Sequence, residues 1–158
     1  MRKDRTEEEL KLASDHLFYE IWMLNSLANG MSSGVLGEGP VNNAVLEAFV
    51  IHVRNIIHFL YADKPKSDHV IAADYFNSPT DWEAIRPKKT ELMKISEIRA
   101  HKEVAHLSYD RAKVTPETKP WTFVDLANEI TSAFNVFLSN INIEVLGDRW
   151  QGNILSEE

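Results

Sequence analysis

One stretch of the sequence combines the residue types that phosphodiester chemistry needs. Arg99 and His106 are seven positions apart, a spacing that places two side chains on one face of an α-helix, roughly 10 Å apart along its axis. An arginine binds phosphate oxygens with its planar fork of N–H groups, and a histidine transfers protons near neutral pH. Because the 2′-hydroxyl of RNA is an internal nucleophile, such a pair could cleave RNA without a metal. The alternative is that both are ordinary surface residues, paired with Glu103 or Asp110.

A helical chain that carries this pair resembles the HEPN domains (higher eukaryotes and prokaryotes nucleotide-binding). The mark of that family is Arg-x(4–6)-His near the end of the third long helix, and Arg99-x6-His106 fits its long form. The run KEVAHLSYDR over residues 102–111 is similar to abortive-infection-type members. Active members are metal-independent endoribonucleases that work as homodimers, with motif residues of both subunits in one cleft. Other members are inactive and serve as binding or dimerising modules.

The resemblance implies a role for each residue of the motif region. Arg99 would stabilise the charge that develops on the phosphorane, and His106 would act as general base or acid. His101, Lys102 and Arg111 would position the RNA backbone. It also implies a cytoplasmic toxin or phage-defence protein that acts on RNA as a homodimer, with an antitoxin as a candidate partner.

Ala100 is a departure from the family pattern, because many active members have Asn, Asp or His directly after the motif arginine. This departure favours a second function of a different class. In that function the chain is a noncatalytic HEPN-like dimerisation module that binds a nucleotide, a nucleic acid or a protein.

A second group of polar residues follows one side of another predicted helix and consists of Glu47, Arg54, Asn55 and His58. The apolar residues around them place this helix at the centre of the fold, which predicts a buried polar network. The alternative is a supporting role in the same cleft as Arg99 and His106. Asp15, His16 and Glu20 are expected on a solvated face or as partners for these cations.

Metal binding is the third function considered, in the form of a metal-dependent helical-bundle enzyme. The chain has six histidines, but no two of them are four positions apart, the spacing of a helical zinc motif. Glu103-x-x-His106 is its single Glu-x-x-His pattern, whereas di-iron bundles use two. The chain has no cysteine. We therefore predict neither a metal nor another cofactor.

The hydrophobic periodicity predicts an all-α fold, an antiparallel four-helix bundle with short extra helices. The long helices are expected over about residues 6–29, 43–61, 90–111 and 122–147, with short helical turns near 70–75 and 79–85. Thr6 and Glu9 form a capping-box pattern at the start of the first helix, and Gly30 and Gly147 are the expected stops of the first and fourth. Residues 1–158 form one domain, with a tail from about 148 to 158 that Trp150, Ile154 and Leu155 could anchor. The expected buried faces are Leu92, Ile95, Ile98, Val104 and Ala105 in the third helix, and Ala127, Ile130, Phe134, Phe137, Ile141 and Val145 in the fourth.

The charge distribution limits the kinds of partner. The net charge is −7 over 158 residues, which argues against broad adhesion to nucleic acid or to an anionic membrane. Residues 86–113, however, hold eight basic residues against four acidic ones, so a focused anion site on the third helix is expected. The longest apolar stretch is interrupted by polar residues, and the N-terminus lacks the apolar core of a signal peptide. We therefore expect a cytoplasmic protein with no membrane segment.

Overall fold

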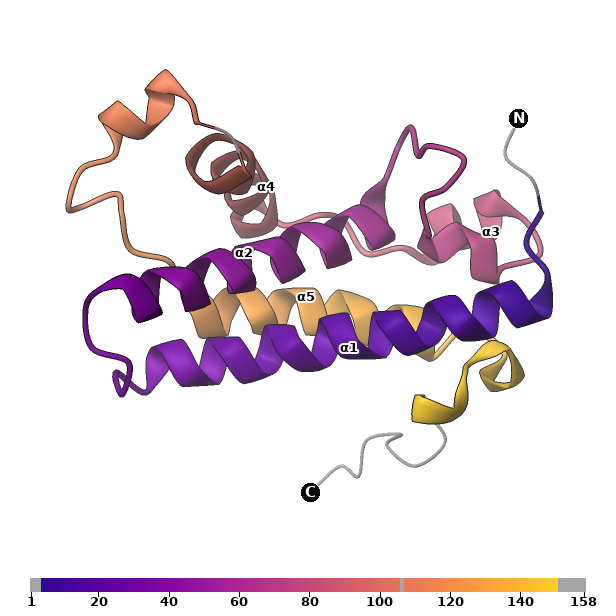
Figure 1. Cartoon of the computed structure of the whole chain (residues 1–158). Coiled ribbons are helices and arrows are strands. Elements are labelled where there is room, and N and C mark those ends of the chain that lie inside the picture. Colours follow the sequence, from indigo (N-terminus) through magenta and orange to yellow (C-terminus); the bar gives the residue numbers. More distant parts are fainter. Residues whose placement is uncertain (1–3, 106, 151–158) are drawn as a thin grey trace.

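The fold is helical, as predicted. The computed structural model of the chain describes residues 4–105 and 107–150, and every regular element in these two ranges is a helix. Three long helices lie side by side, α1 (Glu7–Ser32), α2 (Pro40–Tyr61) and α5 (Phe123–Leu138) (Figure 1). A short loop makes α1 and α2 antiparallel, and α5 runs in the same direction as α2 (Figure 1).

The first helix begins at the predicted cap. The Thr6 hydroxyl accepts a hydrogen bond from the Glu9 backbone N–H at 3.1 Å, and the Glu9 carboxylate accepts one from the Thr6 N–H at 2.8 Å. The expected stop at Gly30 is wrong, because α1 continues to Ser32. A glycine costs a helix only about 1 kcal/mol. The loop starts instead around Gly34, whose positive φ of 70° is easily reached only without a side chain.

The second helix is the centre of the core. Nine of its residues are buried, including Phe49, Ile56 and Ile57, and it packs against α1, α4 and α5. Trp82 of α3 (Pro79–Ile85) is also buried, and its indole N–H donates to the Leu60 carbonyl at 2.9 Å. By length and composition alone α2 could cross a membrane, and 50% of that stretch is buried inside the fold. The predicted short turns are also present, as η1 (Ala72–Tyr75) and α3.

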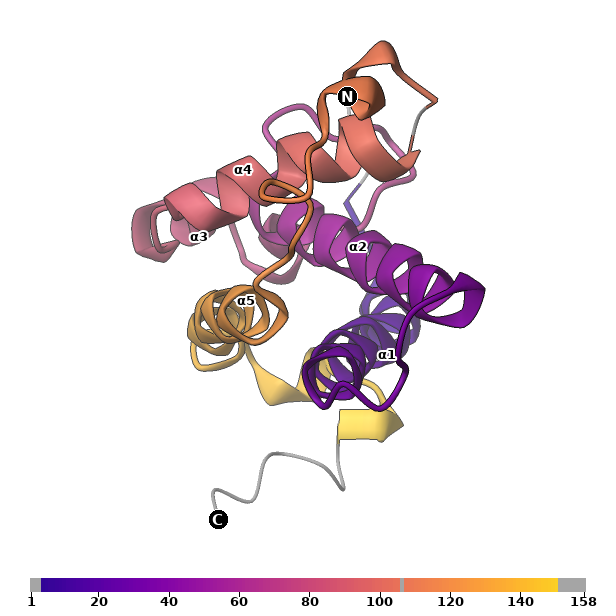
Figure 2. The ribbon, with the colours of Figure 1, turned by 90° about the vertical axis from the view of Figure 1, so that its left-hand side faces the viewer.

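The third predicted helix is shorter than expected. The α-helix α4 (Glu91–Arg99) has nine residues and continues as one π-helical turn, η2 (Ala100–Ala105), followed by the 3₁₀ turn η3 (Tyr109–Lys113). The regular α-helix assumed beyond Arg99 is therefore not present over residues 100–105, because a π turn bonds each N–H five residues back instead of four. Figure 2 shows α4 crossing over α2 on the side away from α1.

The buried face of this segment agrees with the prediction only in part, since Leu92 and Val104 are partly buried against the core as expected. Ile95 and Ile98 are 49% and 56% exposed, whereas Met93, Ser96 and Ala100 are buried. The Thr90 hydroxyl caps the helix by accepting from the Met93 N–H at 3.2 Å, and it also donates to Glu129 of α5. This second bond joins the start of α4 to α5. Because Met93, Ser96 and Ala100 face the core, Ile95 and Ile98 are left in solvent.

The fourth predicted helix ends early. Ala127, Ile130, Phe134 and Phe137 are buried as expected, but α5 ends at Leu138, so the expected stop at Gly147 is wrong. Ile141 and Val145 are partly buried against the core from outside the helix. Val145 belongs to the 3₁₀ turn η4 (Ile143–Val145).

The C-terminal segment returns to the first helix. The Gly147 N–H donates to the Ser14 hydroxyl at 2.7 Å, and the Trp150 indole N–H donates to the Ser14 carbonyl at 2.8 Å. A Cβ atom on Gly147 would lie 2.5 Å from Asp15 Oδ1, so glycine permits this close approach. Trp150, in η5 (Asp148–Trp150), is a buried anchor as predicted. The other two predicted anchors, Ile154 and Leu155, lie outside the described residues.

Candidate functional site

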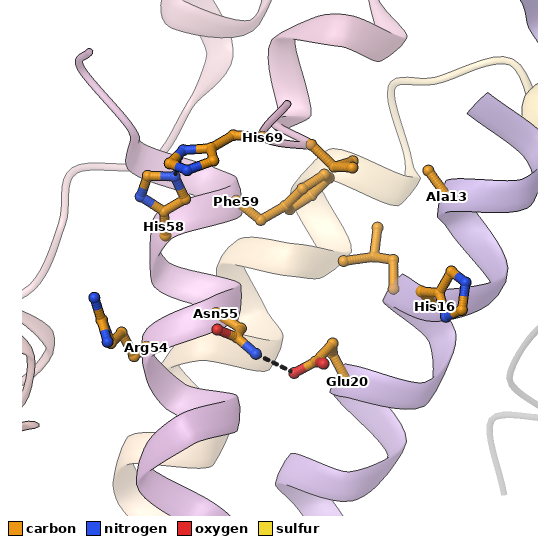
Figure 3. Close-up of a pocket in the computed structure, with 10 residues that line it drawn as sticks. Ala13, His16, Glu20, Arg54, Asn55, His58, Phe59 and His69 are labelled. Carbon is orange, nitrogen blue, oxygen red and sulfur yellow. Dashed lines mark hydrogen bonds between the residues drawn. The ribbon is translucent and has the colours of Figure 1, made fainter. Parts of the chain in front are cut away.

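Two hollows flank the outward face of α2, and Arg54 and His58 line both of them. Each has a volume of about 430 Å³. The α1 pocket lies between α1 and α2 (Figure 3) and is lined by Ala13, His16, Leu17, Glu20, Arg54, Asn55, His58, Phe59, His69 and Val70. The α4 pocket lies between α2 and the α4–η2 segment and is lined by Arg54, His58, Glu97, Ile98, His101 and Lys102.

A carboxylate forms the polar end of the α1 pocket. Glu20 Oε2 accepts hydrogen bonds from the imidazole of buried His52 at 2.7 Å and from the Asn55 amide at 3.1 Å (Figure 3). Burial acts to raise the pKa of Glu20, but these hydrogen bonds outweigh it, and the pKa is lowered. Glu20 is therefore ionised at neutral pH, and it lies in the pocket as a hydrogen-bond acceptor.

Two imidazoles meet at the other end of this pocket. His58 Nε2 and His69 Nδ1 are 2.8 Å apart. His69 Nδ1 also accepts from the Lys66 backbone N–H at 3.3 Å, so His58 must be the donor. Neutral His58 then carries its proton on Nε2, and its Nδ1 is a free base. Burial, followed by the charges of His69 and Arg54, lowers the pKa of His58, which keeps this base unprotonated at neutral pH.

The α4 pocket gathers positive and proton-transferring groups. Arg54 and His58 come from α2, and His101 and Lys102 come from the π turn η2. The single carboxylate among its lining residues is Glu97, which is held by Lys89 at 2.8 Å. The Lys102 ammonium contacts Asp110 at 3.1 Å. Exposed ion pairs of this kind contribute little to stability, so the Lys102 ammonium can exchange Asp110 for another anion.

Arg99 does not line either pocket. Its guanidinium donates to both oxygens of Glu103 at 3.0–3.2 Å and to the Lys119 and Pro120 carbonyls at 3.0 Å. It also lies over the Trp121 ring. The pairing with Glu103 is the surface alternative that the sequence allowed. In this arrangement Arg99 fixes the start of η2 to the segment that leads into α5.

The remaining predicted residues are divided by the fold. Arg111 donates to the Val104 carbonyl at 2.9 Å, next to η2 but outside the α4 pocket. Glu47 is exposed and lines neither pocket. Arg54 and Asn55 are exposed, so the buried polar network predicted on α2 is wrong for these residues. His106 lies outside the described residues.

Three residues that contribute to the site were not singled out for it by the sequence. Glu20 was expected on a solvated face or as a partner for cations of the second helix, and it bonds to His52 and Asn55 of α2. His52 and His69 had no predicted role. Glu20 and His52 are 32 positions apart, and His58 and His69 are joined through an irregular loop, so no helical spacing relates either pair. The only signal was the number of histidines.

Among residues 4–105 and 107–150, no group of three or more His, Cys, Asp or Glu side chains could hold a metal ion. Compared with models of known protein families, with curated protein sequences and with solved structures, the chain matches none of them.

Proposed function

We propose that the protein is a metal-independent endoribonuclease whose scissile phosphate binds in the α4 pocket. The observation that carries this proposal is the gathering of Arg54, His58, His101 and Lys102 around one hollow of about 430 Å³. Two of these side chains carry a positive charge, and two can move protons near neutral pH. RNA cleavage needs both kinds of group and no metal.

The reaction would follow the general chemistry of an RNA phosphodiester. The 2′-oxygen attacks phosphorus, and the bond from phosphorus to the 5′-oxygen breaks. A base removes the proton of the 2′-hydroxyl, and an acid delivers one to the leaving 5′-oxygen. The products are a 2′,3′-cyclic phosphate and a 5′-hydroxyl end. Arg54 and Lys102 stabilise the negative charge on the phosphorane oxygens.

His58 is the general base in this proposal. Its Nε2–H is committed to His69, which leaves Nδ1 unprotonated, and its lowered pKa keeps the ring neutral at neutral pH. His101 would bind a phosphate oxygen. His106, expected from the sequence to act as general base or acid, would be the acid. Arg99 becomes a positioning residue, since it holds η2 and therefore the two residues of η2 that line the pocket.

The wider biological proposal rests on the resemblance to HEPN domains. It comprises a HEPN-like four-helix arrangement and a homodimer that brings two copies of the α4 pocket together. It also comprises a cytoplasmic toxin or phage-defence role with an antitoxin partner. Sedimentation of the purified protein tests the dimer directly, and a monomer at all accessible concentrations would contradict it.

RNA cleavage in EDTA tests the enzymatic proposal. A 5′-labelled RNA is incubated with wild type and with the variants Arg54→Met, His58→Asn, Lys102→Met and His106→Ala. Removing a general base or acid typically costs about 10²–10⁴-fold in rate, so His58→Asn and His106→Ala should lose at least the lower value. Lys94→Met is the matched control, because Lys94 lies on exposed α4 surface outside both pockets.

Each result has a defined meaning. Cleavage that disappears in EDTA contradicts the metal-independent mechanism. Cleavage that survives both His58→Asn and His106→Ala removes the assigned proton-transfer residues. The ends of the products also test the mechanism. Attack by the 2′-hydroxyl requires a 5′-hydroxyl end, and a 5′-phosphate end is not compatible with it.

A noncatalytic binding module is the second candidate, and the partners of Arg99 favour it. An arginine whose fork is bonded within its own chain has few donors left for a substrate phosphate. In that case the α4 pocket would bind a nucleotide or an RNA phosphate without cleaving it. Tight RNA binding that depends on Arg54 and Lys102, with no product over long incubation, would establish this function.

A further inference from the structure

We infer that the α1 pocket binds a guanine base of the RNA, next to the phosphate in the α4 pocket. This inference rests on the proposed function and adds a substrate preference to it. The two pockets share Arg54 and His58 as a common wall. A nucleotide whose phosphate contacts that wall from the α4 side therefore has its base within reach of the α1 side.

The α1 pocket has the composition of a base-binding site. Leu17, Phe59 and Val70 supply apolar surface, and the side chains of Glu20 and His16 project from α1 on the opposite side from His58 and His69 (Figure 3). Ligand sites commonly combine such apolar walls with few polar groups that fix orientation. The imidazole rings of His58 and His69 add flat surfaces on which a base can stack.

Glu20 determines which base fits. A carboxylate has about four lone-pair positions, and the bonds from His52 and Asn55 both end on Oε2. Oε1 is therefore left to accept from a ligand. Because the carboxylate is ionised, it can accept hydrogen bonds but cannot donate one. The ligand edge has to present N–H groups.

Guanine matches this requirement better than the other three bases. Its Watson–Crick edge carries two adjacent donors, N1–H and the N2 amino group, which Glu20 Oε1 can accept together with its two lone-pair positions. Adenine and cytosine pair one amino donor with a ring acceptor, and uracil has one N–H between two carbonyl acceptors. An acceptor facing an acceptor on any of these bases is unfavourable.

Binding of 3′-mononucleotides tests the inference separately from cleavage, because these compounds contain no phosphodiester bond that the enzyme could cleave. Isothermal titration with 3′-GMP, 3′-IMP, 3′-AMP, 3′-CMP and 3′-UMP should give 3′-GMP the lowest Kd, about tenfold below that of 3′-AMP. Inosine lacks the N2 amino group, so 3′-IMP should lie between them. Glu20→Gln should abolish the preference for guanine.

Two further variants keep the result interpretable. Glu8→Gln alters an exposed carboxylate in the first turn of the same helix and should keep the preference. Ala13→Leu fills the α1 pocket without altering Glu20. It should therefore weaken the binding of all five nucleotides and leave the binding of inorganic phosphate unchanged. This second variant decides the matter if Glu20→Gln does not fold.

The inference is overturned by equal affinities for the five nucleotides, by a guanine preference that persists in Glu20→Gln, or by no binding of any nucleotide. The proposed function is decided independently by cleavage in EDTA. A ribonuclease without base preference and a guanine-binding protein without cleavage are thus distinguishable outcomes.

Discussion

The guanidinium carbon of Arg99 lies 4.2 Å from the centre of the Trp121 ring. This cation–π contact comes in addition to five hydrogen bonds from the same guanidinium. The contacts join α4, the π turn and the segment before α5 at a single side chain. The η2 segment contributes His101 and Lys102 to the α4 pocket, and Arg99 connects this segment to the rest of the fold.

Replacement of Arg99 by lysine should destabilise the protein although it keeps the charge. An ammonium cannot reproduce the planar fork that bonds Glu103 and two carbonyls together. We expect the free energy of unfolding to fall by about 1–3 kcal/mol, measured by urea denaturation. The amides of η2 should also exchange with solvent faster. Arg54→Lys, on the exposed face of α2, is the control and should change stability by less than about 0.5 kcal/mol.

The His58–His69 contact should make stability depend on pH. The pKa of His58 is lowered by burial first and then by His69 and Arg54, so below its usual value of 6.5 the unfolded chain binds a proton that the folded chain does not. Stability contributed by neutral His58 is complete above this value and is lost as pH falls from it towards the folded pKa.

Urea denaturation between about pH 5 and pH 7.5 measures this dependence. His58→Asn should flatten the curve relative to wild type, and Arg54→Met should flatten it partly, because it removes one of the charges that lower the pKa. A wild-type curve that His58→Asn leaves unchanged would exclude the proposed protonation behaviour.

Two glycines should respond in opposite directions to substitution by alanine. At Gly147 the new Cβ would lie 2.5 Å from Asp15 Oδ1 and 2.7 Å from the Lys11 carbonyl oxygen, so Gly147→Ala should cost about 1–3 kcal/mol. At Gly30, inside α1, nothing lies within 4 Å. Gly30→Ala should stabilise the protein by about 0.5–1 kcal/mol. Thermal melting of both variants checks the pair, and equal effects would contradict it.

Two tyrosines form a second matched pair. The Tyr75 hydroxyl donates to the Leu10 carbonyl at 3.0 Å, whereas the buried Tyr61 hydroxyl has no hydrogen-bond partner among the described residues. Tyr75→Phe should therefore cost about 1 kcal/mol. Tyr61→Phe should be neutral or slightly stabilising, because it removes an unsatisfied polar group. Chemical denaturation distinguishes the two, and a large loss for Tyr61→Phe would indicate a partner for its hydroxyl.

Local sequence patterns predicted the elements that depend on local physics. The capping box of Thr6 and Glu9 located the start of α1, and the apolar period of α5 identified Ile130, Phe134 and Phe137 as core. The end of α5 and the rotation of α4 could not be predicted in this way. Both depend on tertiary contacts, such as the bond from Thr90 to Glu129, that no periodicity encodes.

The site was predicted in part. The sequence identified His101 and Lys102 on one helix and Arg54 and His58 on another, and the fold brings these four side chains to one pocket. It could not predict that Arg99 lies outside, because the π turn changes which side chains share a face. Likewise His69 lies in a loop, where no spacing rule relates it to His58.

The contacts of Ser14 have a consequence for synthesis of the chain. This one residue accepts hydrogen bonds from Gly147 and Trp150, which are 133 and 136 positions further along the sequence. The groups that cover this part of the first helix are therefore made more than a hundred residues after it. A ribosome that has not yet translated Trp150 therefore carries an α1 with an uncovered apolar surface, and this domain completes its packing only after that residue has been made.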